Sequence, residues 1–334
     1  MVGVMKTKTA KAAKSAKKST TKTKAAKSAT ANSSPGTVRA GNRDIPVSNT
    51  AKVLYPEAEF TKGDVVAYYL AVAPALLPHL KNRPLTLKRY PNGVEQPFFY
   101  EKMCPSHRPT WVATARVDTT EREIDFCVVN DAATLAWVAN LASLELHCSL
   151  ARTPHLERPT FMVFDHDPGE GAGMLDCVRV ALRLRDMFEE LGLTSLAKTS
   201  GGKGLHLYVP LNTPSVTFDD TKTFSKAIAQ VLEKEDPSRV TTNMRKELRK
   251  GKVFVDWSQN DRHKTTATVY SLRARTRPTV STPVEWGELE RALKKGDASG
   301  LVFETADVLK RVKKKGDLFE AVLTMKQKLP RMGS

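Results

Sequence analysis

The sequence predicts an α+β fold with mixed and antiparallel sheets. Short segments of alternating polarity, amphipathic segments of helical period, and Pro, Gly and Asn clusters between them support this. The chain has 334 residues, of which 40% are hydrophobic, so it can bury one large core or two smaller ones. The sequence contains no internal repeat and no second linker, so we expect one compact domain over residues 41–330, or two packed subdomains within it.

A lysine-rich segment precedes this domain. Residues 1–35 contain nine lysines and no acidic residue. Such a segment has little apolar surface to bury, so we predict a disordered basic tail over residues 1–40. The net charge is +17, and about eight positive charges remain when these nine are removed. Both parts indicate a polyanionic partner, although the tail has the alternative of a solubilising extension.

The first half of the domain begins with a predicted helix. Thr61, followed three residues later by Asp64, has the pattern of a capping box at a helix start. Residues 84–102 alternate apolar and basic side chains around a Pro-Asn-Gly turn, which predicts two strands joined by a loop. The segment REIDFCVV predicts a further strand, and residues 130–147 predict a helix that gives way to the strand-like ELHCSL.

The second half alternates strands and helices. A strand is expected at 160–165 and an amphipathic helix from Met174 to Leu191. Gly201 and Gly202 then predict a tight hairpin, because glycine tolerates the positive φ values of such turns. Two further helices are expected at 217–235 and 238–250, before the strands KVFVDW and TVYSLRARTR.

We expect an intracellular protein without a membrane partner. The apolar stretch 65–77 contains proline and is shorter than the roughly 20 residues that span a bilayer. The N-terminus has no apolar run of secretory type. The four cysteines are widely spaced, so we expect reduced, mostly buried thiols. The alternative is a zinc site, whose ligand spacing would match no standard pattern, formed by Cys104, His107, His147 and Cys148.

Three aspartates are candidate metal ligands. Asp165 and Asp167 end the apolar segment FMVFD, two residues apart and hence on one face of a strand. Like charges this close repel unless a cation neutralises them. Asp256 ends the second apolar strand, KVFVD, and three carboxylates suffice for the two metal ions of phosphoryl transfer. The alternatives are a solvated acidic loop and a turn-capping aspartate.

The predicted hairpin SGGKGLH can bind phosphate through Ser200, glycine amides, Lys203 and His206. It is not a Walker loop, because Ala197 occupies the position of the first glycine. The segment GEGAGM likewise departs from the dinucleotide-binding pattern at its last position. P-loop NTPases and dehydrogenases are therefore not supported, and the alternative for the hairpin is a plain β-turn with a solvated lysine.

Basic and aromatic side chains provide further candidates. Arg273, Arg275 and Arg277 recur at period two, which predicts a row of bidentate phosphate ligands on one face of a strand. Aromatic rings interleaved with basic groups suit base stacking beside phosphates, although core packing is the alternative for at least one ring. These interleaved residues are Lys88, Arg89, Phe98, Phe99, Tyr100 and Lys102.

The segments FDHDPGEG, KTSGGKGLHLYVPL and DWSQNDRHKTTATVYSLRARTRPTVSTPVEW resemble the polymerase domain of bacterial ligase D, in the archaeo-eukaryotic primase superfamily. The resemblance extends from Asn49 to about Leu329 and includes KVLYP, TKGDVVAYY and KRYPNGVEQPFFYEK. It implies the primase-polymerase fold, in which sheets form a catalytic cleft flanked by helices. One departure is His166 inside the D-x-D motif, where the family often has an aliphatic residue; strand alternation predicts that it points to the opposite face.

The resemblance also implies roles for individual residues. Asp165, Asp167 and Asp256 would be the catalytic triad that binds two divalent ions, Mn²⁺ or Mg²⁺. The incoming nucleotide would be bound by His147, Ser200, Lys203, Arg249, Arg273, Arg275 and Lys88. DNA would be bound by Lys52 and Lys62, which would contact the 5′-phosphate at a break, and by the base-stacking Phe99 and Tyr100.

The implied function is that of a nucleotidyltransferase, a template-directed polymerase that fills gaps and extends ends in bacterial non-homologous end joining. The expected ligands are NTPs or dNTPs, DNA ends with a 5′-phosphate, and gapped or primer-template DNA. Ku is an expected partner, and the absence of a K-x-D-G motif implies a separate DNA ligase. The expected location is the cytoplasm, at the bacterial nucleoid. The alternatives are a stand-alone primase-polymerase and a noncatalytic DNA-binding protein, against which the three aspartates argue.

Overall fold

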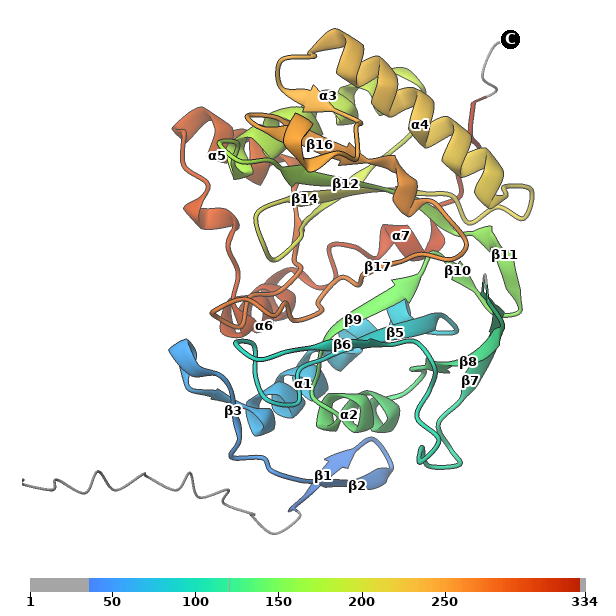
Figure 1. Cartoon of the computed structure of the whole chain (residues 1–334), viewed down its shortest axis with the longest axis vertical. Coiled ribbons are helices and arrows are strands. Elements are labelled where there is room, and N and C mark those ends of the chain that lie inside the picture. The colour runs from blue at the N-terminus through green and yellow to red at the C-terminus, as the bar shows by residue number, and fades with distance from the viewer. Residues whose placement is uncertain (1–35, 120, 331–334) are drawn as a thin grey trace, which may run out of the picture. The chain divides into compact units, whose positions relative to one another are not determined.

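The computed structural model describes residues 36–119 and 121–330, so the lysine-rich part of the predicted tail lies outside the described residues. The first described element is β1 (Gly36–Ala40), which pairs with β2 (Arg43–Val47). The tail boundary predicted at residue 40 is therefore too late, because β1 lies within the predicted tail. Two six-stranded sheets follow, and Figure 1 shows them facing each other.

The first of these sheets is built from the middle and the C-terminal parts of the chain. Its neighbours are antiparallel except for one parallel pair, β15 with β16. Helices cover its outer face (Figure 1). In spatial order its strands are β15 (Val240–Thr241), β16 (Val253–Asp256), β12 (Phe161–Pro168), β14 (Leu205–Pro210), β13 (Leu196–Thr199) and β18 (Pro283–Val284). The covering helices are α3 (Met174–Glu190), α4 (Phe218–Glu235) and α5 (Trp286–Lys295).

The second sheet is antiparallel throughout its described pairs. The helices α1 (Lys62–Leu80) and α2 (Ala132–Asn140) lie on its outer face (Figure 1). Its spatial order is β17 (Thr265–Ala267), β9 (Ser143–Ser149), β5 (Pro84–Arg89), β8 (Glu123–Val128) and β7 (Thr114–Asp118), and β6 (Phe99–Glu101) also pairs with β5.

Short elements complete the described part of the chain. Two are hairpins, β3 (Val53–Tyr55) with β4 (Phe60–Thr61) and β10 (Ala151–Arg152) with β11 (His155–Pro159). The remaining helices are η1 (Pro56–Ala58), η2 (Lys246–Arg249), η3 (Trp257–Gln259), η4 (Ser299–Leu301), α6 (Thr305–Lys315) and α7 (Ala321–Thr324).

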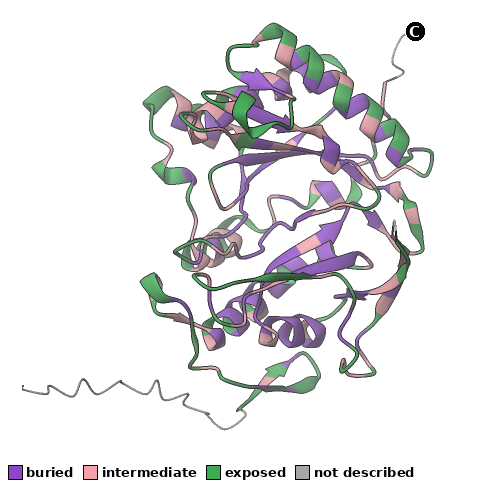
Figure 2. Cartoon of the chain, in the orientation of Figure 1, coloured by how far each residue is buried: buried purple, intermediate pink, exposed green. Residues whose placement is uncertain are grey.

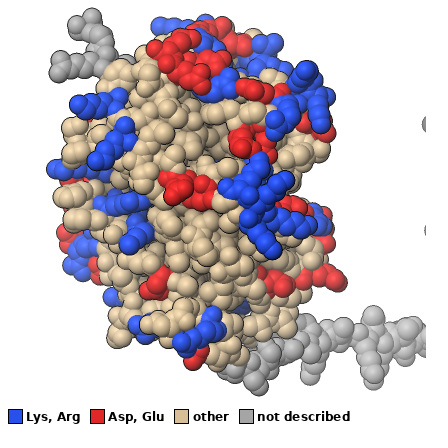
Figure 3. Space-filling view, turned by 180° about the vertical axis from the view of Figure 1, so that it is seen from behind, with Lys and Arg blue, Asp and Glu red and all other residues tan. Residues whose placement is uncertain are grey.

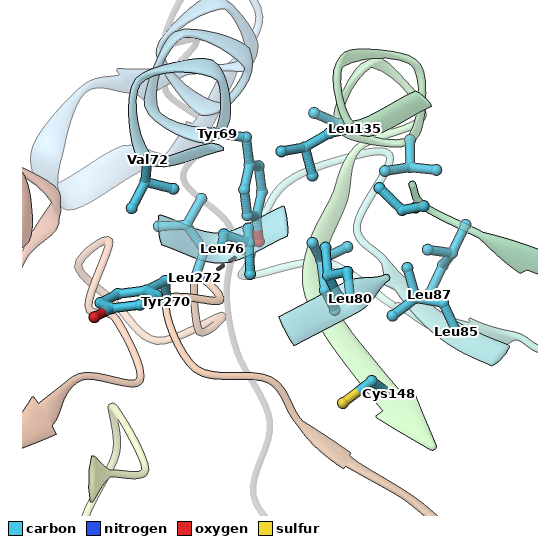
Figure 4. Packing of buried hydrophobic residues seen from close by; sticks show 14 of the residues in the cluster. Tyr69, Val72, Leu76, Leu80, Leu85, Leu87, Leu135, Cys148, Tyr270 and Leu272 are labelled. Atoms are coloured by element: carbon cyan, nitrogen blue, oxygen red, sulfur yellow. Dashed lines mark hydrogen bonds between the residues drawn. The ribbon is translucent and has the colours of Figure 1, made fainter. Parts of the chain in front are cut away.

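Helix α1 organises the core on the side of the second sheet. It begins at the predicted capping box, where Thr61 and Asp64 exchange side-chain and backbone hydrogen bonds. Tyr69 of α1 is fully buried and donates its hydroxyl to the Leu144 carbonyl oxygen at 2.8 Å. Figure 4 shows Tyr69 and Leu76 of α1 packed among side chains of the sheet and of α2. By length and composition alone α1 could cross a membrane. However, 56% of its apolar 18-residue stretch is buried inside the structure, as in a core helix of a globular protein.

A second core lies between the first sheet and its helices. Helix α3 begins at Met174 as predicted, and its apolar face includes the fully buried Leu184 and Phe188. Each such side chain contributes roughly 1.5–3 kcal/mol when removed from water. In Figure 2 the strands of both sheets are largely buried, while the covering helices expose their outer sides. Each of the two sheets is thus packed against a core of its own.

The helix predicted at 238–250 is wrong. The structure has the short strand β15, an irregular segment and the single turn η2 in its place. Thr241 Oγ1 accepts the Asn243 amide at 3.1 Å, and Asn243 Oδ1 accepts the Arg245 amide at 3.0 Å. These side chains satisfy backbone donors locally and so compete with helical hydrogen bonds.

The regular strand predicted for TVYSLRARTR is also wrong. Tyr270 has a positive φ of 65°, and the Arg275 amide donates to the Arg273 carbonyl oxygen at 2.9 Å, which turns the chain. The three arginines therefore do not form one row. Arg277 forms an ion pair with Glu304, away from the other two.

The cysteine prediction is half right. Cys148 and Cys177 are buried free thiols, but a disulfide joins Cys104 to Cys127. Cys104 follows β6 in the chain and Cys127 lies on β8, so only the folded sheet brings them together. The alternative zinc site is not formed, because its Cys104 is in this disulfide; in the described ranges no cluster of His, Cys, Asp and Glu could hold a metal ion in its present geometry.

Candidate active site

A pocket of about 820 Å³ lies between the two sheets, and both contribute to its wall. The first sheet provides Asp165, Asp167 and His206, and the second provides Thr86 and His147. The other lining residues are Tyr100, Lys102, Pro168, Gly169, Glu170, Ser200, Lys203, Lys246, Arg249, Gln259, His263, Lys264, Thr265, Thr266, Ala267, Arg273 and Arg275. Seven lysines and arginines line the pocket against three acidic residues, so the pocket suits an anionic ligand.

The register of β12 and β16 brings the aspartates together. Asp165 is paired directly with Asp256, although the two are far apart in the chain. Asp167 lies two residues further along β12, on the face of Asp165. His166 between them is fully buried on the other face, as strand alternation predicted.

The three carboxylates have different surroundings. The Asp165 side chain is 17% exposed; its Oδ1 lies 3.2 Å from His206 Nε2 but in no hydrogen-bonding geometry with any described residue. Asp256 is turned toward its own loop, where Oδ1 accepts from the Ser258 amide at 2.9 Å and hydroxyl at 2.6 Å, and Oδ2 accepts from Gln259. Asp256 itself does not line the pocket, while Asp165 and Asp167 do.

The electrostatics of this group favour a bound cation. Burial and then the charge of Asp256 raise the pKa of Asp165 to about 6. Withdrawal from bulk solvent and then the charges of Asp165 and Asp256 raise the pKa of Asp167 to about 7. Because Asp167 is an exposed residue, the repulsion by these two carboxylates is the main cause of its raised pKa. Oxygen ligands, mutual repulsion and the unpaired Oδ1 of Asp165 together fit a divalent cation such as Mg²⁺ or Mn²⁺.

The hairpin between β13 and β14 forms another part of the wall. Gly201 has a positive φ of 69°, as the turn requires, and a Cβ at Gly204 would lie 2.1 Å from the His166 carbonyl oxygen. Ser200 Oγ accepts from the amides of Gly202 and Gly204, at 3.2 Å each. These two amides are thus engaged within the turn, while the side chains of Ser200 and Lys203 line the pocket.

A buried carboxylate on β9 connects several of the predicted nucleotide ligands. Glu145 accepts from Arg273 Nε at 3.1 Å, from His147 Nε2 at 2.9 Å and from Lys88 Nζ at 3.4 Å. Lys88 is not a lining residue of the pocket. Its Nζ lies 4.2 Å from the centre of the Phe98 ring, so this ammonium is held by rings and by Glu145.

Arg249 and Arg275 also line the pocket. The Arg249 guanidinium stacks 3.6 Å from the Phe254 ring centre and donates to the Met244 carbonyl oxygen at 2.7 Å. The aromatic segment after β5 is exposed at the edge of the pocket, with Phe99 43% and Tyr100 56% exposed. Of these two rings, Tyr100 lines the pocket. Exposed aromatic rings beside basic groups suit nucleotide bases.

A second cationic site is formed by Lys52 and Lys62, outside the main pocket. The Lys62 amide donates to the Lys52 carbonyl oxygen at 2.8 Å, which brings the two residues side by side. Lys62 is 7% exposed, and its Nζ contacts Ser48 Oγ at 3.4 Å. Burial and then the charges of Lys52 and Arg89 lower the pKa of Lys62 to about 8. A bound anion would stabilise the charged forms of both lysines.

Several lining residues were not among the predicted ligands. Lys246 lies on the turn η2, and Gln259, His263 and Lys264 follow Asp256 in the chain. The sequence does carry a signal for these residues, because Arg262, His263 and Lys264 form a basic run directly after the third aspartate. Lys102 is a further basic lining residue.

A model of the family described as LigD, primase-polymerase domain, matches residues 61–319, most of the chain. The chain belongs to this LigD primase-polymerase family. The multifunctional non-homologous end joining DNA repair protein LigD of Mycobacterium tuberculosis is 41% identical over 291 residues, 84% of this chain and 37% of that protein. The bifunctional non-homologous end joining protein LigD of Bacillus subtilis is 32% identical over 265 residues, 79% of this chain and 42% of that protein.

The fold agrees with this family. The polymerase domain of M. tuberculosis ligase D, solved in complex with DNA, matches with a TM-score of 0.79 and 41% identity, covering 85% of this chain and 99% of that one. The predicted α+β primase-polymerase fold is thus confirmed. A LigD primase-polymerase domain is a metal-dependent nucleotidyltransferase, and this chain is an enzyme of that class. The chain spans less than half the length of these two LigD proteins.

Proposed function

We propose that the chain is a template-directed polymerase that fills gaps and extends DNA ends in bacterial non-homologous end joining. The observation that carries the proposal is the direct pairing of Asp256 with Asp165, which lines a pocket that Arg273 and His147 line as well. Carboxylates on one wall and basic groups on the other suit two metal ions and a nucleoside triphosphate. The names of the related LigD proteins support the setting in end joining.

In the proposed reaction the 3′-hydroxyl of a primer attacks the α-phosphorus of the nucleotide. The new bond is a phosphodiester, the bond to pyrophosphate breaks, and the proton of the 3′-hydroxyl is released. Asp165, Asp167 and Asp256 would hold two divalent ions, which supply Lewis-acid stabilisation to the attacking and leaving oxygens. Arg273, Arg275, Ser200, Lys203 and Arg249 bind and orient the triphosphate, and His147 completes their pocket. Lys88 and Phe99 are assigned to the nucleotide and base-stacking side of the cleft. Tyr100 stacks against a base at the edge of the pocket.

The DNA end is assigned to Lys52 and Lys62. A terminal 5′-phosphate carries more negative charge than an internal diester, so two neighbouring ammonium groups distinguish the two. Basic and acidic side chains lie intermixed on the face shown in Figure 3, so surface charge alone does not mark a DNA path. The assignment therefore rests on the burial of Lys62 beside Lys52.

The finer expectations complete the proposal. Manganese is the preferred activator, both NTPs and dNTPs are substrates, and the enzyme works with Ku and a separate DNA ligase in the bacterial cytoplasm, at the nucleoid. The separate ligase is inferred from the absence of a K-x-D-G motif, and the family resemblance supports the other expectations.

A primer-extension assay tests the function. We expect nucleotide addition to a gapped, 5′-phosphorylated duplex in Mn²⁺ and none after chelation by EDTA. A reaction without primer is the comparison. Synthesis there at the rate of primer extension would favour a stand-alone primase, and no synthesis on any substrate would contradict the proposal.

A further inference from the structure

Glu145 is a buried carboxylate that was not among the predicted functional residues. It lies in the middle of β9, and the residue is 2% exposed. It does not line the pocket, although His147, two residues further along the same strand, does. A buried ionised carboxylate is costly unless it is paired and hydrogen-bonded, so its partners explain its presence.

Both carboxylate oxygens are occupied by donors from separate parts of the chain. Oε1 accepts from Lys88 Nζ at 3.4 Å and from the Ala274 amide at 3.1 Å. Oε2 accepts from Arg273 Nε at 3.1 Å and from His147 Nε2 at 2.9 Å. Burial alone would raise the pKa of Glu145, but the hydrogen bond from His147 and the charge of Arg273 hold it well below its usual range. The group is therefore an anion that accepts four hydrogen bonds.

These contacts restrict the two partners that line the pocket. Glu145 engages Arg273 at Nε, while Arg273 Nη1 donates to the Ser200 carbonyl oxygen, so the guanidinium is held at two points. The Glu145 contact also fixes the imidazole ring of His147, because Nε2 donates to Glu145. In the neutral ring this leaves Nδ1 as an acceptor, which suits a hydroxyl donor of the nucleotide. An arginine held in this way loses little side-chain entropy when it binds a phosphate.

We propose that Glu145 is a positioning residue for the incoming nucleotide, which holds Arg273 in the orientation that binds the triphosphate and fixes the ring of His147 beside it. It also keeps the basic groups of this wall from repelling one another. The inference rests on the proposed function, because it takes the triphosphate as the ligand of the pocket.

The test is the substitution Glu145→Gln, which keeps the shape of the side chain. Glutamine has one acceptor oxygen and one NH₂ group that only donates. The groups that donate to one of the two Glu145 oxygens would therefore face another donor. We expect the Kd of Glu145→Gln for α,β-methylene-ATP with Mn²⁺, measured by calorimetry, to be at least tenfold higher than that of the parent. The KM for ATP in primer extension should rise by a similar factor. The Kd for gapped DNA should change less than about twofold, which a merely unfolded variant would not allow. Glu145→Asp keeps both acceptor oxygens and should show a smaller rise.

Asp317→Asn is the matched control. Asp317 is also a carboxylate that accepts from an imidazole and a second donor, His79 at 2.7 Å and Tyr270 at 2.7 Å, but it does not line the pocket. This variant should lose thermal stability and keep the nucleotide Kd. An equal rise of that Kd in Asp317→Asn would assign the effect to general loosening and overturn the proposal.

A double-mutant cycle tests whether Glu145 acts through its partner. Arg273→Ala should raise the nucleotide Kd, and adding Glu145→Gln to it should raise the Kd much less than Glu145→Gln does alone. Two outcomes would overturn the positioning role: independent effects of the two substitutions on the Kd, or a folded Glu145→Gln variant with the parental Kd. If Glu145→Gln does not fold, Glu145→Asp replaces it, and its Kd should rise at least threefold. A parent chain that binds the analogue but extends no primer contradicts the proposed function and leaves the result on Glu145 intact.

Discussion

Replacing Lys62 by methionine should stabilise the protein while it removes a function. Lys62 is 7% exposed and lies in the first turn of α1, where the helix dipole disfavours a cation. Its pKa is lowered from the ordinary 10.5 to about 8, first by burial and then by the charges of Lys52 and Arg89. The difference corresponds to roughly 3 kcal/mol. Because the ammonium group reaches the exposed Ser48, solvent screens part of this, and we expect about 1–2 kcal/mol.

The sign of the pH dependence follows from the lowered pKa. Below pH 8 Lys62 is charged in both the folded and the unfolded state, so its buried charge lowers the free energy of unfolding to the full extent. Between pH 8 and 10.5 the folded state loses its proton first, and the free energy of unfolding of the parent rises. Lys62→Met should therefore have a higher free energy of unfolding at pH 7, by urea denaturation, and lack this rise. A variant less stable than the parent at pH 7 would refute the reasoning.

The functional half of the prediction concerns a DNA end. A hydrogen bond from an ammonium group to a phosphate contributes about 1.5–3 kcal/mol, roughly a ten- to hundredfold change in Kd. The parent should bind gapped DNA with a 5′-phosphate more tightly than 5′-hydroxyl DNA by such a factor. Lys62→Met and Lys52→Ala should each reduce the preference, and the double variant should erase it. Extension of a primer-template without a downstream strand should survive, because it has no 5′-phosphate at the break.

A charge-matched control separates recognition from general attraction. Lys81→Met removes the same charge from the exposed far end of α1 and should keep the preference. In the parent the preference should weaken between pH 7 and 9, as Lys62 loses its proton. If the parent does not distinguish the two DNAs, or if Lys81→Met loses as much preference as Lys62→Met, the end-recognition hypothesis fails.

Asp165→Ala or Asp167→Ala should abolish nucleotide addition in primer extension and change the Kd for DNA by less than about threefold, since DNA affinity comes mainly from Lys and Arg on phosphates; full activity in either variant would remove the metal hypothesis. Mn²⁺ should raise the Tm of the parent by relieving carboxylate repulsion, and a similar rise in Asp165→Asn would show that the ion binds elsewhere. Deleting residues 1–35 should weaken nonspecific DNA affinity and flatten its salt dependence, without changing turnover at saturating DNA. An unchanged salt slope would leave the tail as a solubilising extension.

Local sequence signals predicted much of the fold correctly. The capping box at Thr61 and the hairpin around Gly201 depend on neighbours within a few residues, and both are found in the structure. The apolar segments before Asp165 and Asp256 formed strands as expected. The helix predicted at 238–250 was wrong because the hydrophobic pattern does not register competing local hydrogen bonds. The side chains of Thr241 and Asn243 accept from backbone amides that the predicted helix required.

The candidate site was predicted unevenly for a related reason. The aspartates were visible because acidic residues at strand ends stand out in an apolar context. The expected row of arginines was not formed, because a turn at Arg275 directs the chain away from a regular strand. The pairing of Cys104 with Cys127 and the role proposed for Glu145 had no local signal, since the two cysteines are 23 residues apart and Glu145 is 128 residues from Arg273.

The sequence by itself determined which chemical groups are present, most of the helices and strands that carry them, and the family to which the motifs are similar. Those properties depend on residue type and on short spacings, which can be read from the sequence. Only the tertiary structure decided that Asp256 faces Asp165, that Lys88 lies among rings and not in the pocket wall, and that Glu145 holds Arg273. The energy of a buried charge depends on the groups around it, and those groups come from distant segments that meet only when the sheets form.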